Sequence, residues 1–565
     1  MKNIITLNLL LTSLTIIQAQ DTSLDWIARA AGTGFDQVFD LHIDDDDNTY
    51  TAGSFSGTMR FIDGSVTIQE SSDGGLDAFA LKLNAEGEIV WYTNFGGSED
   101  DYCYGITTDS QGNIFLAGSF KGTVDFDPSE NEKFSTAVGN FDMYISKFDA
   151  SGNYLWTKTI GNTSVDEAKS ICTDENDNIY ITGRFLRTTD FDPGSGVAEL
   201  SGANSTPDGF VLKLDNDGNY QWAHKIGSSS GLENGEVIVD GKDGSILVSG
   251  GFDSTVDFDP SNGTAELFGA GLSEIYFAKY DYNGNFKWVK SFQGDGYETC
   301  QDLAVDLDGN IYATGWFRDA ADFDTGSGVT LFTSEGAEDS FIAKLSPQGN
   351  TIWARQIGSP NLEWSYSIAV DEIGDVYTTG FFYSTVDFDP TSGSTELTSE
   401  GIEDVFITKL NTDGSFEWAK QVGGNGSDGG YGIEIGDNGD IFVLGNHWDT
   451  ADLDPETSVF NVSNNGSSDA FVIKINQTVI SDIDYNEELK TNFLIAPNPS
   501  QGILHINQIG TQDLEQIDIY SAQGVLVKSQ SAPRQSINLS YLPKGLYSVI
   551  LYTKDGKINL PWAKI

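Results

Sequence analysis

Six pairs of aspartates, each with the pattern Asp-x-Asp, have the type and spacing that suit metal chemistry. In an extended segment residues i and i+2 point to the same side, so the two carboxylates of a pair lie close together. Two like charges at that spacing need a cation or hydrogen-bond donors beside them. The pattern therefore predicts hard-cation sites, with calcium as the possible ion and loop carbonyls as further ligands. The pairs are Asp125/Asp127, Asp190/Asp192, Asp257/Asp259, Asp322/Asp324, Asp387/Asp389 and Asp452/Asp454.

A second interpretation is that groups of the protein itself neutralise these carboxylates. One lysine recurs in step with the pairs, and further bases lie near a recurring tryptophan. Because seven lysines accompany six pairs, this interpretation is favoured. It predicts a lysine, an arginine or a backbone N–H within hydrogen-bond reach of every pair. The recurring lysines are Lys82, Lys147, Lys213, Lys279, Lys344, Lys409 and Lys474, and the other bases are Lys158, His224, Lys290, Arg355 and Lys420.

Catalytic motifs are not evident. The four histidines are scattered, and the sequence has no H-E-x-x-H or G-x-S-x-G pattern and no nucleophile–base spacing. Carboxylates are plentiful, so their residue types leave a glycosidase open. A pair repeated six times is nevertheless more typical of a structural role, because an active site is normally a single departure from a repeat.

The elements that position these residues repeat along the chain. A tryptophan recurs every 65 or 66 residues, and a glycine that ends a strand-like run follows the same period. A fixed period of this kind indicates an array of supersecondary units. The tryptophans are Trp26, Trp91, Trp156, Trp222, Trp288, Trp353 and Trp418, and the glycines are Gly53, Gly118, Gly183, Gly250, Gly315, Gly380 and Gly445.

Each repeat contains four strand-like runs separated by turns rich in Asp, Gly and Asn, residues that tolerate the positive φ of a tight hairpin. No segment has sustained helical periodicity. Four antiparallel strands repeated radially predict an all-β fold, a seven-bladed β-propeller over residues 20–476. The seventh repeat reaches Lys474 without a tryptophan strand, whereas the mature chain begins with one, Leu24 to Arg29. We therefore expect the N-terminal strand to close the last blade.

The repeat unit resembles a known family. The recurring pattern D-x-x-G-N-I-Y-x-T-G-x-F, V-D-F-D-P, D-x-F-x-x-K-L and G-N-x-x-W-A-K-x-I-G is similar to the bacterial β-propeller repeat called SBBP. The resemblance covers nearly all of residues 20–476. It implies a secreted propeller and implies no particular reaction.

The two ends of the chain indicate export. Residues 1–19 have a basic start and a short apolar stretch, which predicts a signal peptide cleaved after Ala19, and we expect no membrane-spanning segment. After a polar linker at 477–492, residues 493–565 resemble the type A C-terminal sorting domain of the type IX secretion system of Bacteroidetes. That resemblance implies a partner in the secretion machinery and a secreted or cell-surface location. We also expect a small β-sandwich there, since Ile517 to Tyr520 alternate in polarity. The residues that carry the resemblance are Pro497, Asn498, Pro499, Gly502, Gly545, Tyr547 and Lys564.

Charge and cysteine content narrow the class of partner. Against 30 Lys and Arg stand 85 Asp and Glu, a formal net charge of −55, which disfavours nucleic acid as a partner. The segment from Phe493 has four acids and six bases, hence +2, so the acidity belongs to the repeats. The three cysteines have no metal-ligand spacing, and we expect them to be small buried apolar residues.

Departures between copies are the best guide to a ligand. The residue after the recurring glycine differs between copies. Copy six adds a tryptophan, and copy seven replaces a phenylalanine with histidine. Exposed aromatic residues suit carbohydrate or protein binding, although packing between blades explains them equally well. The candidate ligand-binding residues are Arg184, Trp316, Trp364, Phe381, Asn446, His447 and Trp448.

These observations favour a secreted binding module for a glycan or a protein partner. An extracellular hydrolase or lyase with a site on one propeller face is the alternative from another class, and a purely structural surface protein is a third. A single pocket with converging carboxylates, an arginine and a tryptophan favours the enzyme. A broad, shallow face favours binding.

Overall fold

The computed structural model describes residues 20–479, apart from 64–66, 130, 229–230, 270, 437 and 457. Beyond residue 492 it describes 493–564 apart from 497–502, 509–513, 522–525, 532–535, 540–541, 543–544 and 554–555. The predicted signal peptide, 1–19, and residues 480–492 of the predicted linker lie outside the described residues. The chain forms two compact units, one of them Ser23–Asn476 and the other containing Gln477–Ile565.

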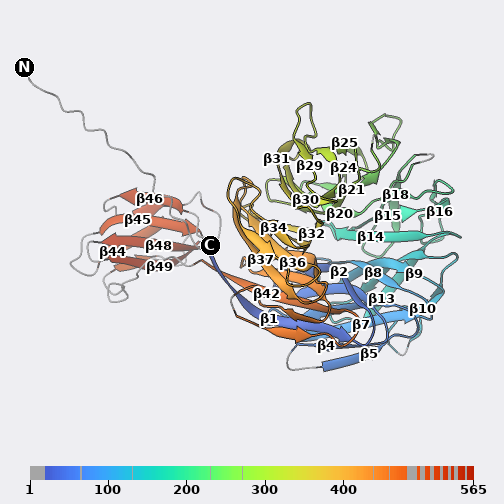
Figure 1. The fold of residues 1–565 in the computed structure, drawn as a ribbon, viewed down its shortest axis with the longest axis horizontal. Helices are drawn as coiled ribbons and strands as arrows, with labels where there is room; N and C mark the ends of the chain where they lie inside the picture. The colour runs from blue at the N-terminus through green and yellow to red at the C-terminus, as the bar shows by residue number, and fades with distance from the viewer. Residues whose placement is uncertain are drawn as a thin grey trace, which may run out of the picture. The chain divides into compact units, whose positions relative to one another are not determined.

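The first unit is a ring of seven antiparallel four-stranded blades, which confirms the predicted propeller (Figure 1). The first strand of each blade lines the centre of the ring. These strands are β2 (Asp36–Ile43), β8 (Tyr102–Thr108), β14 (Asp166–Thr173), β20 (Val237–Asp240), β26 (Glu298–Val305), β32 (Glu363–Val370) and β38 (Gly429–Ile435).

The second and third strands are buried along their length, because each blade is covered by a neighbour on both faces; this explains why their sequences are apolar on both faces. The second strands are β3 (Thr49–Phe55), β9 (Ile114–Phe120), β15 (Ile179–Phe185), β21 (Ser245–Phe252), β27 (Ile311–Phe317), β33 (Val376–Phe382) and β39 (Ile441–His447). The third strands are β6 (Asp77–Leu83), β12 (Asp142–Phe148), β18 (Asp208–Leu214), β24 (Glu274–Asp281), β30 (Asp339–Leu345), β36 (Asp404–Leu410) and β42 (Asp469–Val479).

The fourth strands carry the repeat tryptophans, and the indole of each blade packs on the next. Trp26 donates its Nε1–H to Ala85 O (3.0 Å), and Trp353 donates to Thr412 O (3.2 Å). Gly87 lies under the Trp26 ring at φ 79°, where a Cβ would be 2.4 Å from the indole, so only glycine fits this turn. The fourth strands are β7 (Ile89–Gly97), β13 (Tyr154–Ile160), β19 (Tyr220–Ile226), β25 (Phe286–Gly294), β31 (Thr351–Ile357), β37 (Phe416–Gly424) and, for the seventh blade, β1 (Gln20–Gly32).

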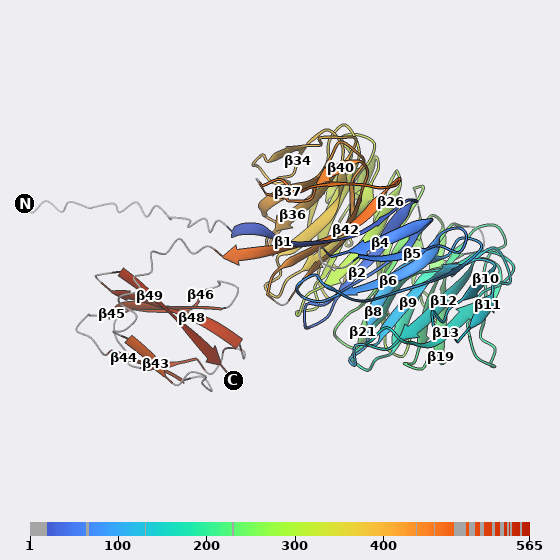
Figure 2. The ribbon, with the colours of Figure 1, turned by 90° about the horizontal axis from the view of Figure 1, so that it is seen from below.

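The N-terminal strand closes the ring as predicted. The sheet order β38-β39-β42-β1 places β1 beside β42, and Figure 2 shows the two strands side by side. Gly32 donates its N–H to Asp469 Oδ1 (3.2 Å), and the Trp26 ring lies 6.0 Å from that of Phe442. The first and last parts of the propeller sequence therefore share one blade.

Each repeat also contains a hairpin between its second and third strands, which we call the insertion hairpin. Several hairpins pair with the fourth strand of the preceding blade, as β10 does with β7 and β40 with β37, so those sheets reach six strands. The sequence did not indicate this pairing. The hairpins are β4 (Thr58–Ile62) with β5 (Thr67–Ser71), β10 (Thr123–Asp125) with β11 (Phe134–Thr136), β16 (Thr188–Asp190) with β17 (Glu199–Ser201), β22 (Thr255–Asp257) with β23 (Glu266–Phe268), β28 (Ala320–Asp322) with β29 (Leu331–Thr333), β34 (Thr385–Asp387) with β35 (Glu396–Thr398), and β40 (Thr450–Asp452) with β41 (Asn461–Ser463).

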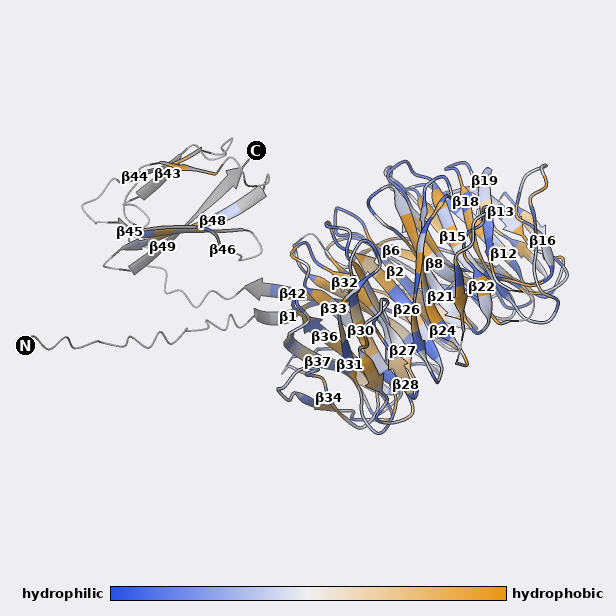
Figure 3. Ribbon diagram, turned by 90° about the horizontal axis from the view of Figure 1, so that it is seen from above, coloured by the Kyte–Doolittle hydropathy of each residue, from blue (hydrophilic) through white to orange (hydrophobic). Residues whose placement is uncertain are grey.

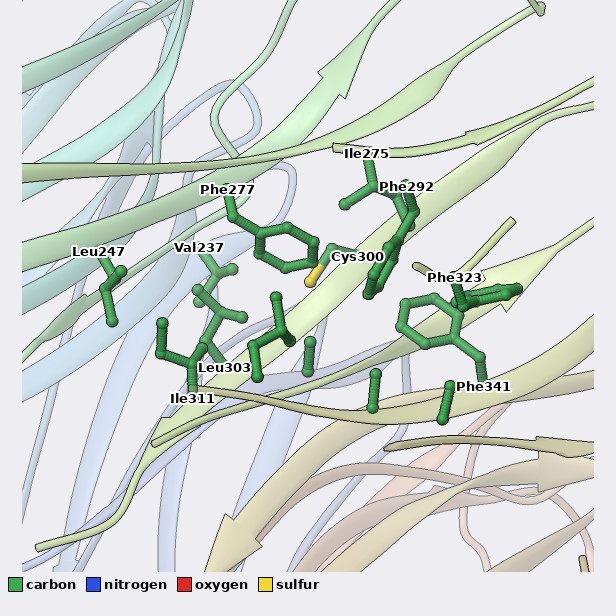
Figure 4. Packing of buried hydrophobic residues seen from close by; sticks show 14 of the residues in the cluster. Val237, Leu247, Ile275, Phe277, Phe292, Cys300, Leu303, Ile311, Phe323 and Phe341 are labelled. Carbon is green, nitrogen blue, oxygen red and sulfur yellow. The ribbon is translucent and has the colours of Figure 1, made fainter. Parts of the chain in front are cut away.

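Hydrophobic cores lie between adjacent blades rather than at the centre of the ring. Figure 3 shows apolar residues along the strands and polar residues along many of the loops. Between blades four and five, Phe277 and Phe292 pack against Cys300 and Leu303 (Figure 4). Cys103 and Cys300 are buried free thiols, as expected of small apolar residues, and Cys172 is partly buried and also free.

The second unit contains a three-stranded sheet, β43-β44-β47, and a four-stranded sheet, β46-β45-β48-β49. Leu504 and Ile537 of the first sheet share a core with Ile519 and Val549 of the second, which confirms the predicted small β-sandwich. Gly545 and Tyr547 lie on β48 and Lys564 on β49, whereas Pro497, Asn498, Pro499 and Gly502 lie outside the described residues. The strands are β43 (Phe493–Ala496), β44 (Ile503–Gln508), β45 (Leu514–Ser521), β46 (Leu526–Ser531), β47 (Ser536–Asn538), β48 (Gly545–Thr553) and β49 (Gly556–Lys564).

Candidate functional site

A cavity of about 480 Å³ lies at the centre of the propeller, lined by the first strands of all seven blades. Such a concave site, enclosed by rigid strands, is the usual form of a ligand pocket. Its lining changes from blade to blade, although the blades themselves repeat. The cavity is therefore where the ring departs from its own symmetry.

In six of the seven blades, a β-bulge in the first strand places one residue at the cavity. The register shifts by one residue between Val38 and Asp40, for example, so Phe39 has no cross-strand partner. A bulge of this kind re-aims a side chain relative to the regular pleat. In the fourth blade the ladder begins at Val237, directly after the equivalent residue, Glu236. The seven residues, all lining the cavity, are Phe39, Tyr104, Lys169, Glu236, Gln301, Tyr366 and Tyr431.

Sequence reasoning missed these bulge residues. The signal was present, since each lies 13 residues after its repeat tryptophan, or 14 in the fourth repeat. Blades one, two, six and seven supply aromatic rings at this position, while Lys169, Glu236 and Gln301 supply polar groups. The cavity mouth therefore has an aromatic side and a polar, charged side.

Three of the predicted ligand-binding residues meet on the aromatic side. The rings of Trp316 and Trp364 stack at 4.8 Å and 10°, across the boundary between blades five and six. Phe381 lies 5.3 Å from Trp364. The opposite end of the stack continues from Trp316 to Tyr297 at 5.4 Å and 16°. Stacking of rings across a blade boundary is the packing that the sequence left open as an alternative to ligand binding.

The aromatic cluster continues onto the bulge residues at the cavity. The Tyr366 ring lies 5.8 Å from Phe381 and 5.0 Å from Tyr431. Trp316, Trp364, Tyr366 and Tyr431 are partly exposed, whereas Phe381 is 7% exposed. Phe381 is thus the buried member of the cluster, and the other four rings offer surface, with Tyr366 and Tyr431 lining the cavity. We call Tyr297, Trp316, Trp364, Tyr366, Phe381 and Tyr431 the aromatic arc.

Arg184, a fourth predicted residue, lies beside Lys169, which lines the cavity. Its Nε donates to Glu167 Oε2, and Lys169 Nζ lies 3.5 Å from the same oxygen. Burial acts to raise the pKa of Glu167, but the charges of Lys169 and Arg184 outweigh it and lower that pKa. Lys169 Nζ also lies 4.0 Å from the centre of the Tyr104 ring, a cation–π contact.

Glu236 completes this charged group. Burial raises the pKa of Glu236, an effect that the charges of Lys169 and Arg184 partly offset. Asn234 donates from its side-chain amide to Glu236 Oε1. Two glutamates on neighbouring blades therefore have pKa values displaced in opposite directions.

Deeper in the cavity, carboxylates tie neighbouring blades together. Asp40 Oδ2 accepts the N–H of Ile106 in the next blade (2.7 Å), and Asp302 Oδ2 accepts that of Ile368 (2.9 Å). Burial raises the pKa of Asp40 to about 7 and that of Asp302 to about 6. Burial also raises the pKa of Glu434 to about 8. Three carboxyl groups that titrate near neutral pH thus share the cavity.

The remaining predicted residues lie in the seventh blade, away from the aromatic arc. Asn446 joins blades seven and one, because it accepts the N–H of Val38 (3.3 Å) and donates to Asp36 O. Trp448 is 39% exposed, with its ring 6.2 Å from that of Phe35. His447 is fully buried. Ligand binding by these three residues stays a prediction.

The Asp-x-Asp pairs lie where the first strand of each insertion hairpin ends and its turn begins, and they accept backbone N–H groups. The first aspartate of each pair accepts two, from the second aspartate at 3.0–3.2 Å and from the residue eight positions on at 2.6–2.8 Å. The second aspartate accepts one, at 2.7–3.0 Å, from two residues on. The expected backbone donors are therefore confirmed.

The expectation that the recurring lysine neutralises these pairs is wrong. The lysine lies on the third strand, and its Nζ reaches the turn between the first two strands, 2.8–3.9 Å from an aspartate there. Lys147, for example, pairs with Asp109 at 3.2 Å and lies over the Phe115 ring. The sequence period gives the spacing of these residues but not the side of the blade they face.

Each pair supplies two carboxylates, so a cation there would need further ligands from loop carbonyls, as expected from the sequence. Among the described residues, no group of three or more His, Cys, Asp or Glu side chains is arranged to hold a metal ion. None of the twelve predicted metal-binding aspartates therefore belongs to such a group, and each pair supplies two carboxylates at most. The first aspartates are Asp125, Asp190, Asp257, Asp322, Asp387 and Asp452, and the second are Asp127, Asp192, Asp259, Asp324, Asp389 and Asp454.

The carboxylates of the pairs accept hydrogen bonds from their own hairpins. The second aspartates show this directly, since Asp192 accepts the N–H of Gly194 (2.7 Å), Asp324 that of Gly326 (2.7 Å) and Asp454 that of Glu456 (3.0 Å). Carboxylate oxygens are donors of the kind that calcium accepts, but calcium takes six to eight oxygen ligands. Calcium at these pairs stays a prediction.

The fold and the ends of the chain define a class: an exported β-propeller with a C-terminal sorting domain. The chain contains a secretion system C-terminal sorting domain at residues 494–560 and matches the β-propeller repeat at 90–119 and 155–184. Both resemblances seen in the sequence are confirmed. The sorting domain is of the type IX kind and indicates delivery to the cell surface or the extracellular space. In the described part of the chain no helix has the length and apolar character needed to cross a membrane.

The chain is also similar to individual proteins. An uncharacterized WD repeat-containing protein of Acanthamoeba polyphaga mimivirus is 24% identical over 516 residues, covering 77% of this chain and 37% of that protein. The regulatory protein FlaEY of Caulobacter vibrioides is 23% identical over 185 residues, covering 32% of this chain and 19% of its own length. The chain thus spans less than two fifths of the length of these relatives. A gluconolactonase structure from Xanthomonas campestris is 11% identical with a TM-score of 0.26, covering 62% and 93% of the two chains. At that TM-score the likeness supports no inference.

Proposed function

We propose that this exported propeller binds a glycan at the mouth of its central cavity. The observation that carries the proposal is the aromatic arc beside the charged group of Glu167, Lys169, Arg184 and Glu236. Aromatic rings contact the apolar faces of sugar rings, and charged or amide side chains pair with hydroxyl groups. Both kinds of surface border one cavity of about 480 Å³.

A glycan suits this site better than a folded protein does. A protein partner typically needs about 800 Å² of buried surface on each side. The mouth instead leads into a concave, mostly polar cavity whose lining includes Gln301, Ser170 and Thr107. A short oligosaccharide can enter such a cavity, whereas a globular surface contacts only its rim.

Binding of soluble glycans to the full-length exported chain tests the proposal. Trp364→Ala and Tyr366→Ala each remove a ring of the aromatic arc, and we expect a loss of about tenfold in affinity from each. Phe134→Ala is the matched control, because Phe134 is 58% exposed on β11, away from the cavity. Unchanged affinity in both arc variants, measured by calorimetry, would argue against this site.

A single cavity with converging carboxylates, near Arg184 and Trp316, is the arrangement linked above to an enzyme, and it favours a second candidate, a carbohydrate-active hydrolase. The pKa values of Asp302, Asp40 and Glu434 lie at about 6, 7 and 8, a range suited to proton transfer at neutral pH. Release of new reducing ends from the same glycans would identify this activity. Binding without product release supports the binding module.

A further inference from the structure

Two series of carboxyl groups lie buried between the blades, outside the candidate site. One series stands at or just before the start of each first strand, and the other begins each third strand. All are at most 3% exposed. The first series is Asp36, Asp101, Asp166, Glu233, Glu298, Glu363 and Asp428. The second series is Asp77, Asp142, Asp208, Glu274, Asp339, Asp404 and Asp469.

The backbone register brings one acid of each series together at every blade junction. Glu298 donates its N–H to Ser273 O, and Ser273 directly precedes Glu274 of the preceding blade. Equivalent bonds join Asp101 to Leu76 O and Glu233 to Pro207 O. At the closure of the ring, an isolated parallel bridge between Phe35 and Ser468 sets Asp36 beside Asp469. The seven junctions are Asp36/Asp469, Asp101/Asp77, Asp166/Asp142, Glu233/Asp208, Glu298/Glu274, Glu363/Asp339 and Asp428/Asp404.

Hydrogen bonding satisfies these carboxyl groups only in part. Asp101 accepts the N–H groups of Gly97 (2.8 Å) and Lys121 (3.1 Å). Both side-chain oxygens of Asp36 and of Glu298, however, are buried without a hydrogen bond of normal geometry in the described structure. One oxygen is in the same situation in each of Asp77, Asp142, Asp339 and Asp404.

A junction with both groups ionised would bury two like charges a short distance apart, which is costly unless one group is neutralised. We propose that the junctions are proton-binding sites, so that folding of the propeller takes up protons near neutral pH and the blades separate more readily as the pH rises. Backbone N–H groups donate to several of these acids, as at Asp101. Such donors stabilise one ionised carboxylate in a junction while the other carboxyl group is neutral.

The pKa directions agree with this placement. Burial, with the charge of the neighbouring acid as a further cause, raises the pKa of Asp36 and of Glu298 to about 8. Burial is also the main cause that raises the pKa of Asp101 and Asp166 to about 7. The neighbours of the two least satisfied junctions differ. Burial raises the pKa of Asp469 and the charge of Arg29 partly offsets this, whereas Asp295 and Asp319 add negative charge at Glu298.

The other junctions have mostly acidic neighbours. Lys225 is an exception, with its Nζ 3.2 Å from Asp208 Oδ1. Negative neighbours favour the neutral form of a carboxyl group. The acids are Asp73 and Asp100 at the junction of Asp77 with Asp101, Glu335 at that of Asp339 with Glu363, and Glu400 and Glu403 at that of Asp404 with Asp428.

The sign of the pH dependence follows from linkage. A carboxyl group whose pKa is raised on folding holds a proton that the unfolded chain has already released. Its contribution to stability is fully present below pH 4 and is lost as the pH rises through about 7 to 8. As the pH rises, each proton taken up on folding lowers the folding equilibrium constant tenfold per pH unit.

Asp36→Asn and Glu298→Gln in the full-length chain test the proposal. Each amide mimics the neutral carboxyl group at the position where the existing oxygens lack donors. We expect both variants to melt at a higher temperature than the wild type at pH 8.5 and near the wild-type temperature at pH 5. In each variant, the folding equilibrium constant should fall less steeply with rising pH than in the wild type, by up to a factor of ten for each pH unit. Asp127→Asn, on an insertion hairpin, is the control with the same chemical change and should keep the wild-type profile.

Two results would overturn the proposal. The first is a wild-type melting temperature that stays constant or rises between pH 5 and 9, which needs no variant to be measured. The second is a profile in Asp36→Asn and Glu298→Gln that is parallel to the wild type. Asp302→Asn separates the cavity acids from the junctions, because it removes a cavity carboxyl group and leaves all seven junctions intact.

Discussion

At the scale of single residues, one buried position of the repeat is occupied by a different residue type in the seventh blade. The end of the second strand is phenylalanine in six blades, and in the seventh it is His447, which is fully buried beside Phe471. Neither ring nitrogen of His447 has a hydrogen bond of normal geometry among the described residues. A histidine in a phenylalanine environment therefore stays neutral, and burial lowers its pKa to about 4.

Restoring the repeat residue should stabilise the seventh blade. His447→Phe removes two buried polar atoms, and we expect a gain of about 1–3 kcal/mol in the free energy of unfolding. Because the pKa is lowered on folding, the cost of His447 grows as the pH falls from 6.5 toward 4, so the gain should be larger at pH 5 than at pH 7. Calorimetry at the two pH values measures it. Phe382→His, the reverse change in blade six, should destabilise the chain, and a gain from it would contradict the explanation.

The Asp-x-Asp pairs allow a test of the calcium prediction at the same scale. Asp387 accepts two backbone N–H groups, from Asp389 (3.1 Å) and Thr395 (2.8 Å). We expect Asp387→Ala to cost about 1–2 kcal/mol through these bonds, and a chelator to leave the melting temperature of the wild type unchanged. A chelator-induced fall that added calcium reverses would show instead that a metal holds the hairpins.

At the scale of elements, the closing strand β1 should decide whether the ring is monomeric. Without Gln20–Gly32 the edge of β42 is unpaired, and an exposed strand edge promotes association. We expect the deleted chain to aggregate in size-exclusion chromatography with light scattering. A permuted chain that joins β1 directly after β42 through a short turn restores the sheet and should remain monomeric. A monomeric deletion variant would show that closure is dispensable.

The elements also show what the sequence could and could not predict. The recurring tryptophans and lysines, which include Trp26 and Lys474, predicted the number of blades and the closure of the ring, because both follow the period of the repeat. The bulge residues, such as Tyr366, keep a fixed distance from the tryptophan, but the period does not show which residue of the first strand leaves the regular pleat, so they were missed. Packing of Trp316 and Trp364 between blades was left open beside ligand binding, because their contact joins two repeats and a period describes positions within one. The pairing of β10 with β7 was missed for the same reason.

At the scale of the whole molecule, each of the two units is a compact body of its own. The sorting domain contains its own apolar core, including Leu504, Ile519 and Val549, and Ser23–Asn476 forms a separate compact unit. A core that is complete within each unit means that neither needs the other to bury its apolar surface. The difference in charge, −55 for the whole chain and +2 from Phe493 onward, also separates them.

Removal of residues 493–565 should therefore block delivery without unfolding the propeller. We expect the truncated chain to accumulate in the periplasm of a type IX-secreting host and to be missing from the surface and the medium, because the sorting domain is the export signal. Its purified form should keep the melting temperature of the propeller and the glycan affinity of the full-length chain. Cell fractionation and calorimetry separate the two effects. Truncated protein at the cell surface would contradict the role of the tail, whereas periplasmic protein that has lost its cooperative melting would show that the units depend on each other.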